Sequence, residues 1–220
     1  NQHTLHSITK IIAGDSPETT QRIAALYGSI NGGNIHIAPN IRTAEAAKVI
    51  ENAQRDINIA FVNEVAQICH KLRISSADVL EAAATKWNFL NFTPGLVGGH
   101  CIGVDPYYLA HRAKQVGHPP KVILAGREIN DGMAEFVSSQ IASRLPLSDS
   151  NILVLGLTFK KNVPDLRNSL VARVIHMLRV KGHSVEVHDP HADPSEAQEI
   201  YDIKLLADLS NTESYDCVVG

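Results

Sequence analysis

The spacing of apolar residues changes near residue 150, and this change divides the sequence into two kinds of structure. Before residue 150, apolar positions recur every three or four residues, which is the spacing of helices buried on one face. After it, continuous apolar runs alternate with helical patterns, which is typical of a parallel sheet covered by helices. The pattern predicts an α/β protein in which an all-helical domain precedes a doubly wound sheet domain.

The longest helical pattern runs from Thr43, its expected cap, to Leu72 and contains no proline or glycine. Such a helix is about 43 Å long. A helix of this length in a small protein usually links domains or lines a dimer interface. Its apolar residues follow helical spacing: Ala46, Ala47, Ile50, Ile57, Ala60, Phe61, Val65 and Ile68.

Capping and turn signals delimit the shorter elements. Ser16 followed by Pro17 predicts a helix over residues 19–27, and Ser75 opens another over residues 77–85. Asp105 at the cap position and Pro106 in the first turn predict a helix over residues 105–116. Further helices are expected over residues 121–145, 166–180 and 194–201. Strands are expected over residues 35–37, 151–157 and 183–190, with brief ones at 203–206 and 216–220. Residues 86–99 are predicted to form an irregular loop, and residues 146–150 a linker.

Composition narrows the class of protein. The 220 residues are 44% hydrophobic and 20% charged, as in an ordinary globular protein. The net charge of −3 gives no argument for binding nucleic acid or a membrane surface. The three widely spaced cysteines favour a reducing compartment over a disulfide framework. No apolar run approaches the length of a membrane span, and no signal peptide is visible.

Both ends of the sequence have the character of cut ends. The chain begins at Asn1 without an initiating methionine, and it stops at Gly220 within an apolar run. We therefore expect a fragment or an incompletely covered chain. A natural terminus left by processing is the alternative.

The glycine-rich segment from Gly98 to Pro106 carries the first candidate for chemistry. Cys101 lies beside paired glycines and four residues before Asp105. Glycine allows a ligand close to the backbone, and a reachable thiolate near a proton-transfer group is a nucleophile. The alternative for Cys101 is a small buried hydrophobic residue in a turn. The alternative for Asp105 is a helix cap, a role that is compatible with proton transfer. His100 and Cys101 are adjacent on an extended loop, so their side chains point apart, which argues against a cysteine hydrolase. No metal-ligand spacing is present, and we expect no metal site.

Two further segments combine polar residues with a defined position. Lys48 and Asn52 are four residues apart and share one face of the long helix, where a solvated surface is the alternative. Residues 156–169 follow the first strand of the sheet domain and include Phe159, Lys160 and Arg167. Ligands bind at the carboxyl ends of such strands, although a basic turn is the alternative. The chain contains no Gly-x-Gly-x-x-Gly motif for a dinucleotide.

These segments resemble the UDP-glucose/GDP-mannose dehydrogenase family, and the matches follow the family's order. Residues 92–109 are similar to its active-site loop, in the form found in the bacterial branch that acts on UDP-N-acetylated hexoses. The Ala-Glu-Ala-Ala-Lys-Val-Ile-Glu-Asn stretch resembles its central helix, around which the dimer forms. Residues 156–169 resemble the signature that opens its Rossmann-like UDP-binding domain. Residues 1–40 are then a remnant of an N-terminal domain, residues 41–147 the helical dimerisation domain, and residues 148–220 a truncated UDP-sugar-binding domain.

The resemblance assigns roles to individual residues. It implies that Cys101 is the nucleophile, with Lys48, Asn52 and Asp105 as its catalytic partners. It implies that Arg167 reaches the NAD cofactor. The residues that it implies for substrate binding are Asn91, Phe92, Gly98, Phe159 and Lys160.

The resemblance also implies a reaction. Members of the family oxidise the 6-hydroxymethyl group of a UDP-hexose to a carboxylate through a thiohemiacetal and a thioester, with two NAD molecules as hydride acceptors. The form of the loop favours N-acetylglucosamine, N-acetylgalactosamine or N-acetylmannosamine as the sugar. A cytoplasmic homodimer that supplies capsule or O-antigen assembly is implied. Because the NAD-binding domain is absent, we expect no turnover by this chain alone. The alternative is an inactive module for dimerisation and UDP-sugar binding.

Overall fold

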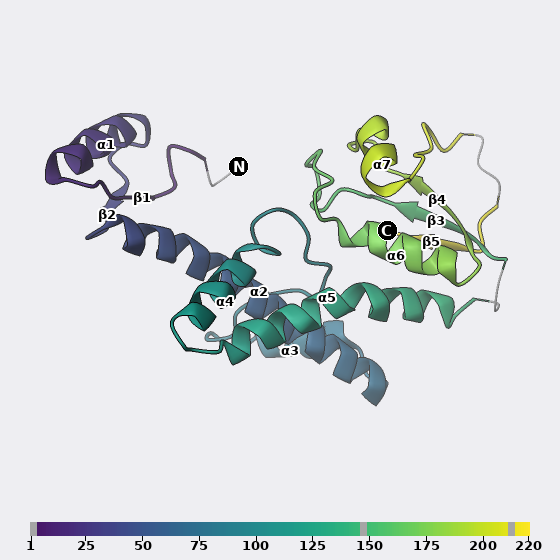
Figure 1. Cartoon of the computed structure of the whole chain (residues 1–220). Helices are drawn as coiled ribbons and strands as arrows, with labels where there is room; N and C mark the ends of the chain where they lie inside the picture. The colour runs from purple at the N-terminus through teal and green to yellow at the C-terminus, as the bar shows by residue number, and fades with distance from the viewer. Residues whose placement is uncertain (1–3, 146–148, 211–213) are drawn as a thin grey trace. The chain divides into compact units, whose positions relative to one another are not determined.

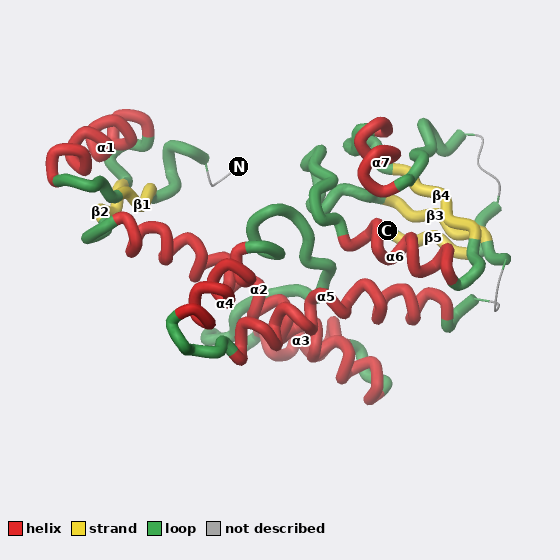
Figure 2. The backbone as a smooth tube through the Cα atoms, in the orientation of Figure 1, coloured by secondary structure: helices red, strands yellow, loops and turns green. Residues whose placement is uncertain are grey.

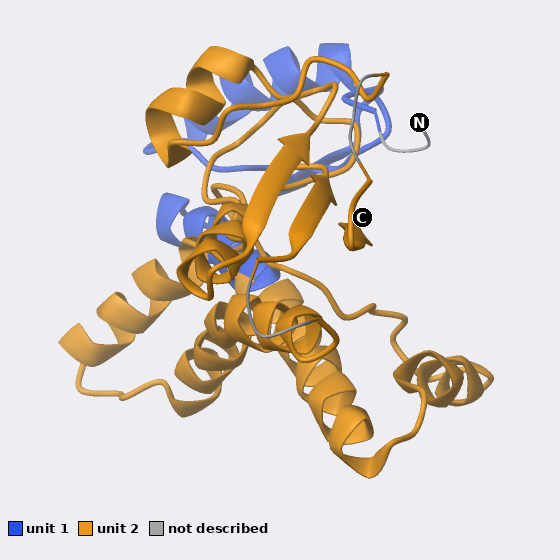
Figure 3. Cartoon of the chain, turned by 90° about the vertical axis from the view of Figure 1, so that its right-hand side faces the viewer, with its two compact units in different colours: residues 1–52 blue, residues 53–220 orange. Residues whose placement is uncertain are grey.

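The computed structural model describes residues 4–145, 149–210 and 214–220 (Figure 1). Helices dominate the chain up to residue 142, and strands alternate with helices after it (Figure 2). This order confirms the change of structure that the apolar spacing predicted. The chain forms two compact units, residues 1–52 and residues 53–220 (Figure 3).

The first unit contains helix α1 (Pro17–Ile30) and two short strands. Strands β1 (Lys10–Ile12) and β2 (Ile35–Ile37) pair in parallel. The predicted helix start is confirmed, because the Ser16 hydroxyl accepts the N–H of Thr19 at 3.1 Å. Strand β1 was not expected from the sequence, since three residues are too few to show an apolar period.

Helix α2 (Ile41–Leu72) begins in the first unit and continues into the second. The cap is Asn40, whose side-chain oxygen accepts the N–H of Thr43 at 2.9 Å. The prediction that Thr43 caps this helix is therefore wrong. Thr43 lies in the first turn, where its own hydroxyl donates to Asn40.

The helical part of the second unit adds α3 (Ser76–Ala84), α4 (Asp105–Gln115) and α5 (Lys121–Ala142). The Ser75 hydroxyl caps α3 by accepting the N–H of Asp78, as predicted. The cap of α4 is Val104, and Asp105 is its first helical residue. The prediction that Asp105 caps this helix is therefore wrong, because the turn after Cys101 already brings Val104 into a helical conformation.

The second part of this unit is a parallel sheet with strand order β4–β3–β5. Its elements in chain order are β3 (Asn151–Leu155), α6 (Leu170–Val180), β4 (Ser184–His188), α7 (Pro194–Tyr201) and β5 (Cys217–Val219). Ile152, Ile175 and Val187 are fully buried in its core. Helix α5 contributes Ala134 to the same core. One helix therefore serves both parts of the unit, and the predicted order of a helical domain before a parallel sheet domain is confirmed.

Some element boundaries differ from the predictions. Helix α6 begins at Leu170 instead of Leu166, because Asn168 adopts a left-handed backbone conformation with φ of 53°. The expected strand at 203–206 is reduced to an isolated bridge between Leu205 and Val187. Residues 146–148 of the expected linker lie outside the described residues. In the described ranges, every helix is too short or too polar to cross a membrane.

Candidate active site

Cys101 lies on an exposed turn that leads into helix α4. Its side chain is free and exposed. Its carbonyl oxygen accepts the N–H of Val104 at 3.2 Å and that of Asp105 at 2.9 Å. The thiol therefore precedes a helix start and is open to solvent. This exposure contradicts the alternative in which Cys101 is a buried hydrophobic residue.

Residues 95–101, called the cysteine loop below, contact Phe159 directly through the two glycines before Cys101. A Cβ atom on Gly98 would lie 2.9 Å from the Cβ of Phe159 and 2.8 Å from the carbonyl oxygen of Asn168. One on Gly99 would lie 2.6 Å from the Phe159 ring, and the φ of Gly99 is +83°. Only glycine fits both positions. The structure thus brings Gly98 and Phe159, two predicted substrate-binding residues, into contact beside the cysteine turn.

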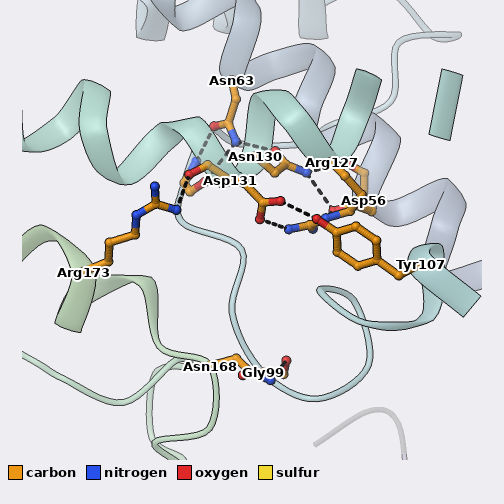
Figure 4. Close-up of polar contacts among 10 residues, drawn as sticks. Asp56, Asn63, Gly99, Tyr107, Arg127, Asn130, Asp131, Asn168 and Arg173 are labelled. Carbon is orange, nitrogen blue, oxygen red and sulfur yellow. Dashed lines mark hydrogen bonds and ion pairs between the residues drawn. The ribbon is translucent and has the colours of Figure 1, made fainter. Parts of the chain in front are cut away.

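Hydrogen bonds reinforce the contact between this loop and the sheet domain. The N–H of Gly99 donates to the carbonyl oxygen of Arg167 at 3.1 Å. The side chain of Asn168 donates to the carbonyl oxygen of Gly99 at 3.2 Å (Figure 4). The loop is therefore held by the segment that precedes helix α6.

The turn after strand β3 is shaped by the buried carboxylate of Asp189. This carboxylate accepts the backbone N–H groups of Leu157, Thr158 and His191 at 2.7, 2.9 and 2.8 Å. Burial alone would raise the pKa of Asp189, but the three N–H donors outweigh it and hold the pKa below its ordinary value. The turn so fixed presents the exposed Lys160 next to Phe159.

Arg167 extends from the same segment and pairs with Asp165. The two side chains approach within 2.6 Å, and the side chain of Arg167 is 58% exposed. Hydrogen bonds from Arg167 lower the pKa of Asp165 to about 2. The guanidinium group keeps an open side that an anionic ligand can reach.

A cleft of about 660 Å³ adjoins these residues within the second unit. Its walls come from the cysteine loop, helices α4 and α5, the segment before α6, and helix α7. The lining residues are Val97, His100, Gly103, Val104, Tyr107, Arg127, Asp131, Arg167, Asn168, Ser169, Leu170, Ile200 and Tyr201. The predicted cofactor residue Arg167 and the neighbours of Cys101 thus share one cleft.

Lys48 and Asn52 lie one turn apart on α2, in the first unit. Lys48 is exposed, whereas Asn52 is only 6% exposed. A solvated helix face therefore does not describe Asn52. Cys101 belongs to the second unit, so an approach of the lysine amine to the thiol stays a prediction.

Asn91 and Phe92 lie in the irregular segment before the cysteine turn and do not line the cleft. Phe92 lines a smaller cavity of about 200 Å³ together with Phe61 and Val62 of α2. Asn91 is exposed, and neither residue lines the cleft beside Arg167. Their assignment to substrate binding stays a prediction.

A buried polar network lies between helices α2 and α5 (Figure 4). Asp56 accepts hydrogen bonds from Arg127 at 2.6 Å and from Asn130 at 2.7 Å. Burial raises the pKa of Asp56, although Arg127 and Asn130 act in the opposite direction. Burial alone would lower the pKa of Arg127, but Asp56 and Asp131 outweigh it and raise the pKa.

The network extends to the cleft on one side and to the cysteine loop on the other. Toward the cleft, Arg127 pairs with Asp131, and the Tyr107 hydroxyl donates to Asp131 at 2.6 Å. This hydrogen bond is the main reason why the pKa of Tyr107 is raised. Toward the loop, Asn63 hydrogen-bonds Asn130 and the backbone of Gly95.

Sequence reasoning assigned no role to the network residues. Asp56 and Asn63 are seven residues apart on one face of α2, among apolar positions, and both are fully buried. Polar residues at core positions of a helix are the signal that would have indicated the network. Asn168 and Asp189 carried no such signal, because both lie in turns.

The described residues form no candidate metal site. Within residues 4–145, 149–210 and 214–220, no group of three His, Cys, Asp or Glu side chains is placed to hold a metal ion.

A helical domain precedes a parallel sheet domain, and the loop that carries Cys101 contacts both. Comparison with known proteins identifies the class of protein to which this arrangement belongs. The family model described as "UDP-glucose/GDP-mannose dehydrogenase family, central domain" matches residues 42–132. The model of that family's UDP binding domain matches residues 153–220. The chain belongs to the UDP-glucose/GDP-mannose dehydrogenase family.

Individual relatives match most or nearly all of this chain. Protein CapL of Staphylococcus aureus is 49% identical over 222 residues, which cover 99% of this chain and 52% of that protein. UDP-N-acetyl-D-glucosamine 6-dehydrogenase of Pseudomonas aeruginosa is 45% identical and covers 99% of this chain and 53% of its own length. The solved UDP-D-ManNAc dehydrogenase of Pyrococcus horikoshii is 31% identical, with a TM-score of 0.77 over 86% of this chain and 46% of that one. The chain thus spans about half the length of the curated relatives it matches.

Proposed function

We propose that this chain is the central and UDP-binding part of an NAD-dependent nucleotide-sugar 6-dehydrogenase, which oxidises a UDP-N-acetylhexosamine to the uronic acid. The observation that carries the proposal is the contact of the Cys101 loop, through Gly98 and Gly99, with Phe159 of the UDP-binding domain. A sugar held at Phe159 would meet the loop that carries the exposed thiol of Cys101. Relatives that act on UDP-N-acetylglucosamine and UDP-N-acetylmannosamine support the class of sugar.

The thiol explains how an alcohol can be oxidised twice in one site. The first oxidation converts the C6 alcohol to an aldehyde, and the thiolate of Cys101 adds to the aldehyde carbon to form a thiohemiacetal. The second oxidation removes a hydride and a proton from that adduct and leaves a thioester. Water then attacks the thioester carbon, the thiolate leaves, and the carboxylate is released.

Three further residues assist this chemistry in the proposal. Lys48 stabilises negative charge that develops on the substrate oxygen, and loss of such a donor commonly costs about 3 kcal/mol in the transition state. Asn52 orients the same oxygen or the attacking water. Asp105, at the first position of α4, takes part in proton transfer to or from that water.

Substrate binding falls to the turn after β3 and to the loop. Lys160 is exposed beside Phe159 and provides a positive charge for the diphosphate. The backbone at Gly98 approaches the sugar, with Asn91 and Phe92 as further contacts on the loop. The fixed turn at Asp189 supports this role, since it pre-organises the residues that meet the ligand.

The residues of this chain fit one side of a nicotinamide cofactor site. Arg167 lines the cleft and exposes its guanidinium, which suits a phosphate of a dinucleotide. The sequence contains no glycine-rich dinucleotide motif, and the proposal assigns the main cofactor contacts to the part of the relatives that this chain does not cover. The cofactor, when bound, accepts one hydride in each oxidation.

A second copy of the chain is the proposed partner of helix α2. Phe61, Ile68 and Leu72 are 57%, 50% and 63% exposed and follow the spacing of one helix face. Burying this face in a homodimer removes apolar surface from water. A cytoplasmic location belongs to the same proposal and is supported by the three free cysteines.

The same features favour a narrower function for this chain by itself, which is UDP-sugar binding without turnover. Calorimetric titration of the chain with UDP-N-acetylglucosamine and with NAD, each alone, separates the two ligands. We expect the UDP-sugar to bind and NAD to bind at least tenfold more weakly. Lys160→Ala should weaken UDP-sugar binding, whereas Lys161→Ala, at a neighbour that is also exposed, should not. Equal affinity of both variants and wild type would contradict the proposed site.

The catalytic role of Cys101 is tested in the full-length enzyme that contains this chain. Cys101→Ser should abolish net acid formation, because a serine alkoxide is not formed readily and an ester is hydrolysed less readily than a thioester. Acid formation is measured by the reduction of two equivalents of cofactor per substrate and by chromatography of the product. Turnover to the acid at the wild-type rate would refute the assignment.

A further inference from the structure

The side-chain amide of Asn63, on helix α2, binds the backbone of the cysteine loop at Gly95. The oxygen of Asn63 accepts the N–H of Gly95 at 2.8 Å, and its amide nitrogen donates to the Gly95 carbonyl at 3.0 Å. The same nitrogen donates its second hydrogen to Asn130 at 2.8 Å. Asn63 thus uses both of its N–H groups and its oxygen, and two of these bonds fix the chain at one loop residue.

The orientation of this amide is set from within the protein. Asp56 is fully buried. The Nδ2 of Asn130 donates to its carboxylate at 2.7 Å and to its backbone carbonyl oxygen at 2.9 Å. Asn130 must therefore turn its oxygen toward Asn63. Asn63 must in turn present its nitrogen to Asn130, which leaves its oxygen for the N–H of Gly95. The buried carboxylate accordingly determines how the loop is bound.

The loop is bound a second time before it reaches the thiol. At Gly99, the carbonyl oxygen of Arg167 and the side chain of Asn168 hold the backbone from the sheet domain. Residues 95–99 are therefore hydrogen-bonded at one end to Asn63 of helix α2 and at the other end to the segment before helix α6. Cys101 follows two residues later.

We infer that Asn63 is a positioning residue for Cys101. Through Gly95 it fixes the helical end of the loop, so that the thiol meets the sugar aldehyde in one orientation. Asn130 and Asp56 act through Asn63 by fixing its amide. This inference rests on the proposed function, in which Cys101 serves only the second oxidation.

The test compares the two oxidations in the full-length enzyme. Asn63→Ala removes all three hydrogen bonds, and Asn63→Asp keeps the shape and the acceptor for Gly95 while removing both donors. At saturating substrates, the aldehyde is trapped with a hydrazine to measure the first oxidation, and acid formation measures the second. We expect the first rate to stay within about twofold and the second to fall by about 100-fold, the size of effect produced by a misplaced reacting group.

Gln67→Ala is the matched control. Gln67 lies one turn beyond Asn63 on the same helix and contacts α5 through the sulfur of Met133 at 3.3 Å, without reaching the loop. We expect both rates of this variant to match the wild type. A loss of folded protein lowers both oxidations equally, so an equal fall in the Asn63 variants, or an unchanged second oxidation, would overturn the inference.

A second measurement separates this inference from the proposed function. If the wild-type enzyme oxidises no UDP-sugar, the proposed function fails, and hydrogen exchange of residues 93–101 decides the positioning. Asn63→Ala should then exchange at least tenfold faster in that segment than both the wild type and Gln67→Ala. Equal exchange in all three proteins would overturn the role of Asn63.

Discussion

The buried pair of Asp56 and Arg127 makes a sharp stability prediction for the chain as it stands. The side chains of Asp56 and Arg127 are 0% and 4% exposed, and the two charges approach within 2.6 Å. Replacing Asp56 by Leu leaves the guanidinium buried with Asp131 as its remaining carboxylate. Breaking a buried ion pair in this way costs about 3–5 kcal/mol.

This cost translates into a large change in melting temperature. For a protein of this size, each kcal/mol lowers the midpoint by about 2–4 °C, so Asp56→Leu should lower it by roughly 10 °C. The double variant Asp56→Leu/Arg127→Met should lose less than Asp56→Leu alone, because it leaves no fully buried charge. Asp131 loses Arg127 in this variant, but its side chain is 38% exposed and keeps the hydrogen bond from Tyr107. Asp56 Oδ2 and Arg127 Nε have no hydrogen-bond partner among the described residues, which further favours the apolar pair.

Thermal melting followed by circular dichroism at two salt concentrations measures the effect. The loss should be nearly independent of salt, since a buried pair is screened little. Arg112→Ala is the control, because it removes an exposed hydrogen bond to Gln115 within α4 and should change the midpoint little. A double variant as unstable as Asp56→Leu, or a loss below about 1 kcal/mol for Asp56→Leu, would refute the reasoning.

Three further predictions follow from other contacts. Gly99→Ala should weaken UDP-sugar binding by about tenfold in calorimetry, because its Cβ would lie 2.6 Å from the Phe159 ring, and unchanged affinity would argue against Phe159 as a ligand contact. The lowered pKa of Asp189 means that its stabilising effect is complete above its unfolded-state pKa of about 4 and is lost as the pH falls through the folded-state value. Asp189→Asn should therefore reduce the loss of unfolding free energy, measured by urea denaturation, as the pH is lowered. An equal loss in the variant and the wild type would exclude this carboxyl as the cause. Phe61→Glu should convert a dimer to a monomer in light scattering, whereas Val180→Glu, at a residue 72% exposed on α6, should not; a dimeric Phe61→Glu protein would count against the α2 interface.

The elements with a clear period were predictable, and those defined by side-chain contacts were not. Long α2 and buried β3 each carry an apolar pattern that local sequence reveals, and both were expected. The start of α6 was misplaced because Asn168 leaves the helical conformation, and its stabilising partner, Gly99, is distant in sequence. Capping by Asn40 instead of Thr43 was missed because both residue types are good caps and lie three positions apart.

The candidate site divides in the same way. Cys101, Gly98 and Phe159 belong to recognisable segments, and the structure brings Gly98 and Phe159 together beside the cysteine turn. The supporting residues were not identified, because Asn63 acts on Gly95 from 32 positions away in the sequence. Pairings over such separations follow from how helices pack, which a local pattern does not encode.

The sharing of α5 between two cores sets a practical limit on dissecting this protein. Ala134, Val137 and Ile141 pack in or against the core of the sheet domain on the side of α6, although they precede β3 and lie beyond the matched central domain. A shortened protein that starts at Asn151 would leave their counterparts on α6 bare to water and prone to self-association. A soluble, separately expressed nucleotide-binding half must instead start near Lys121 and carry the whole of α5 with it.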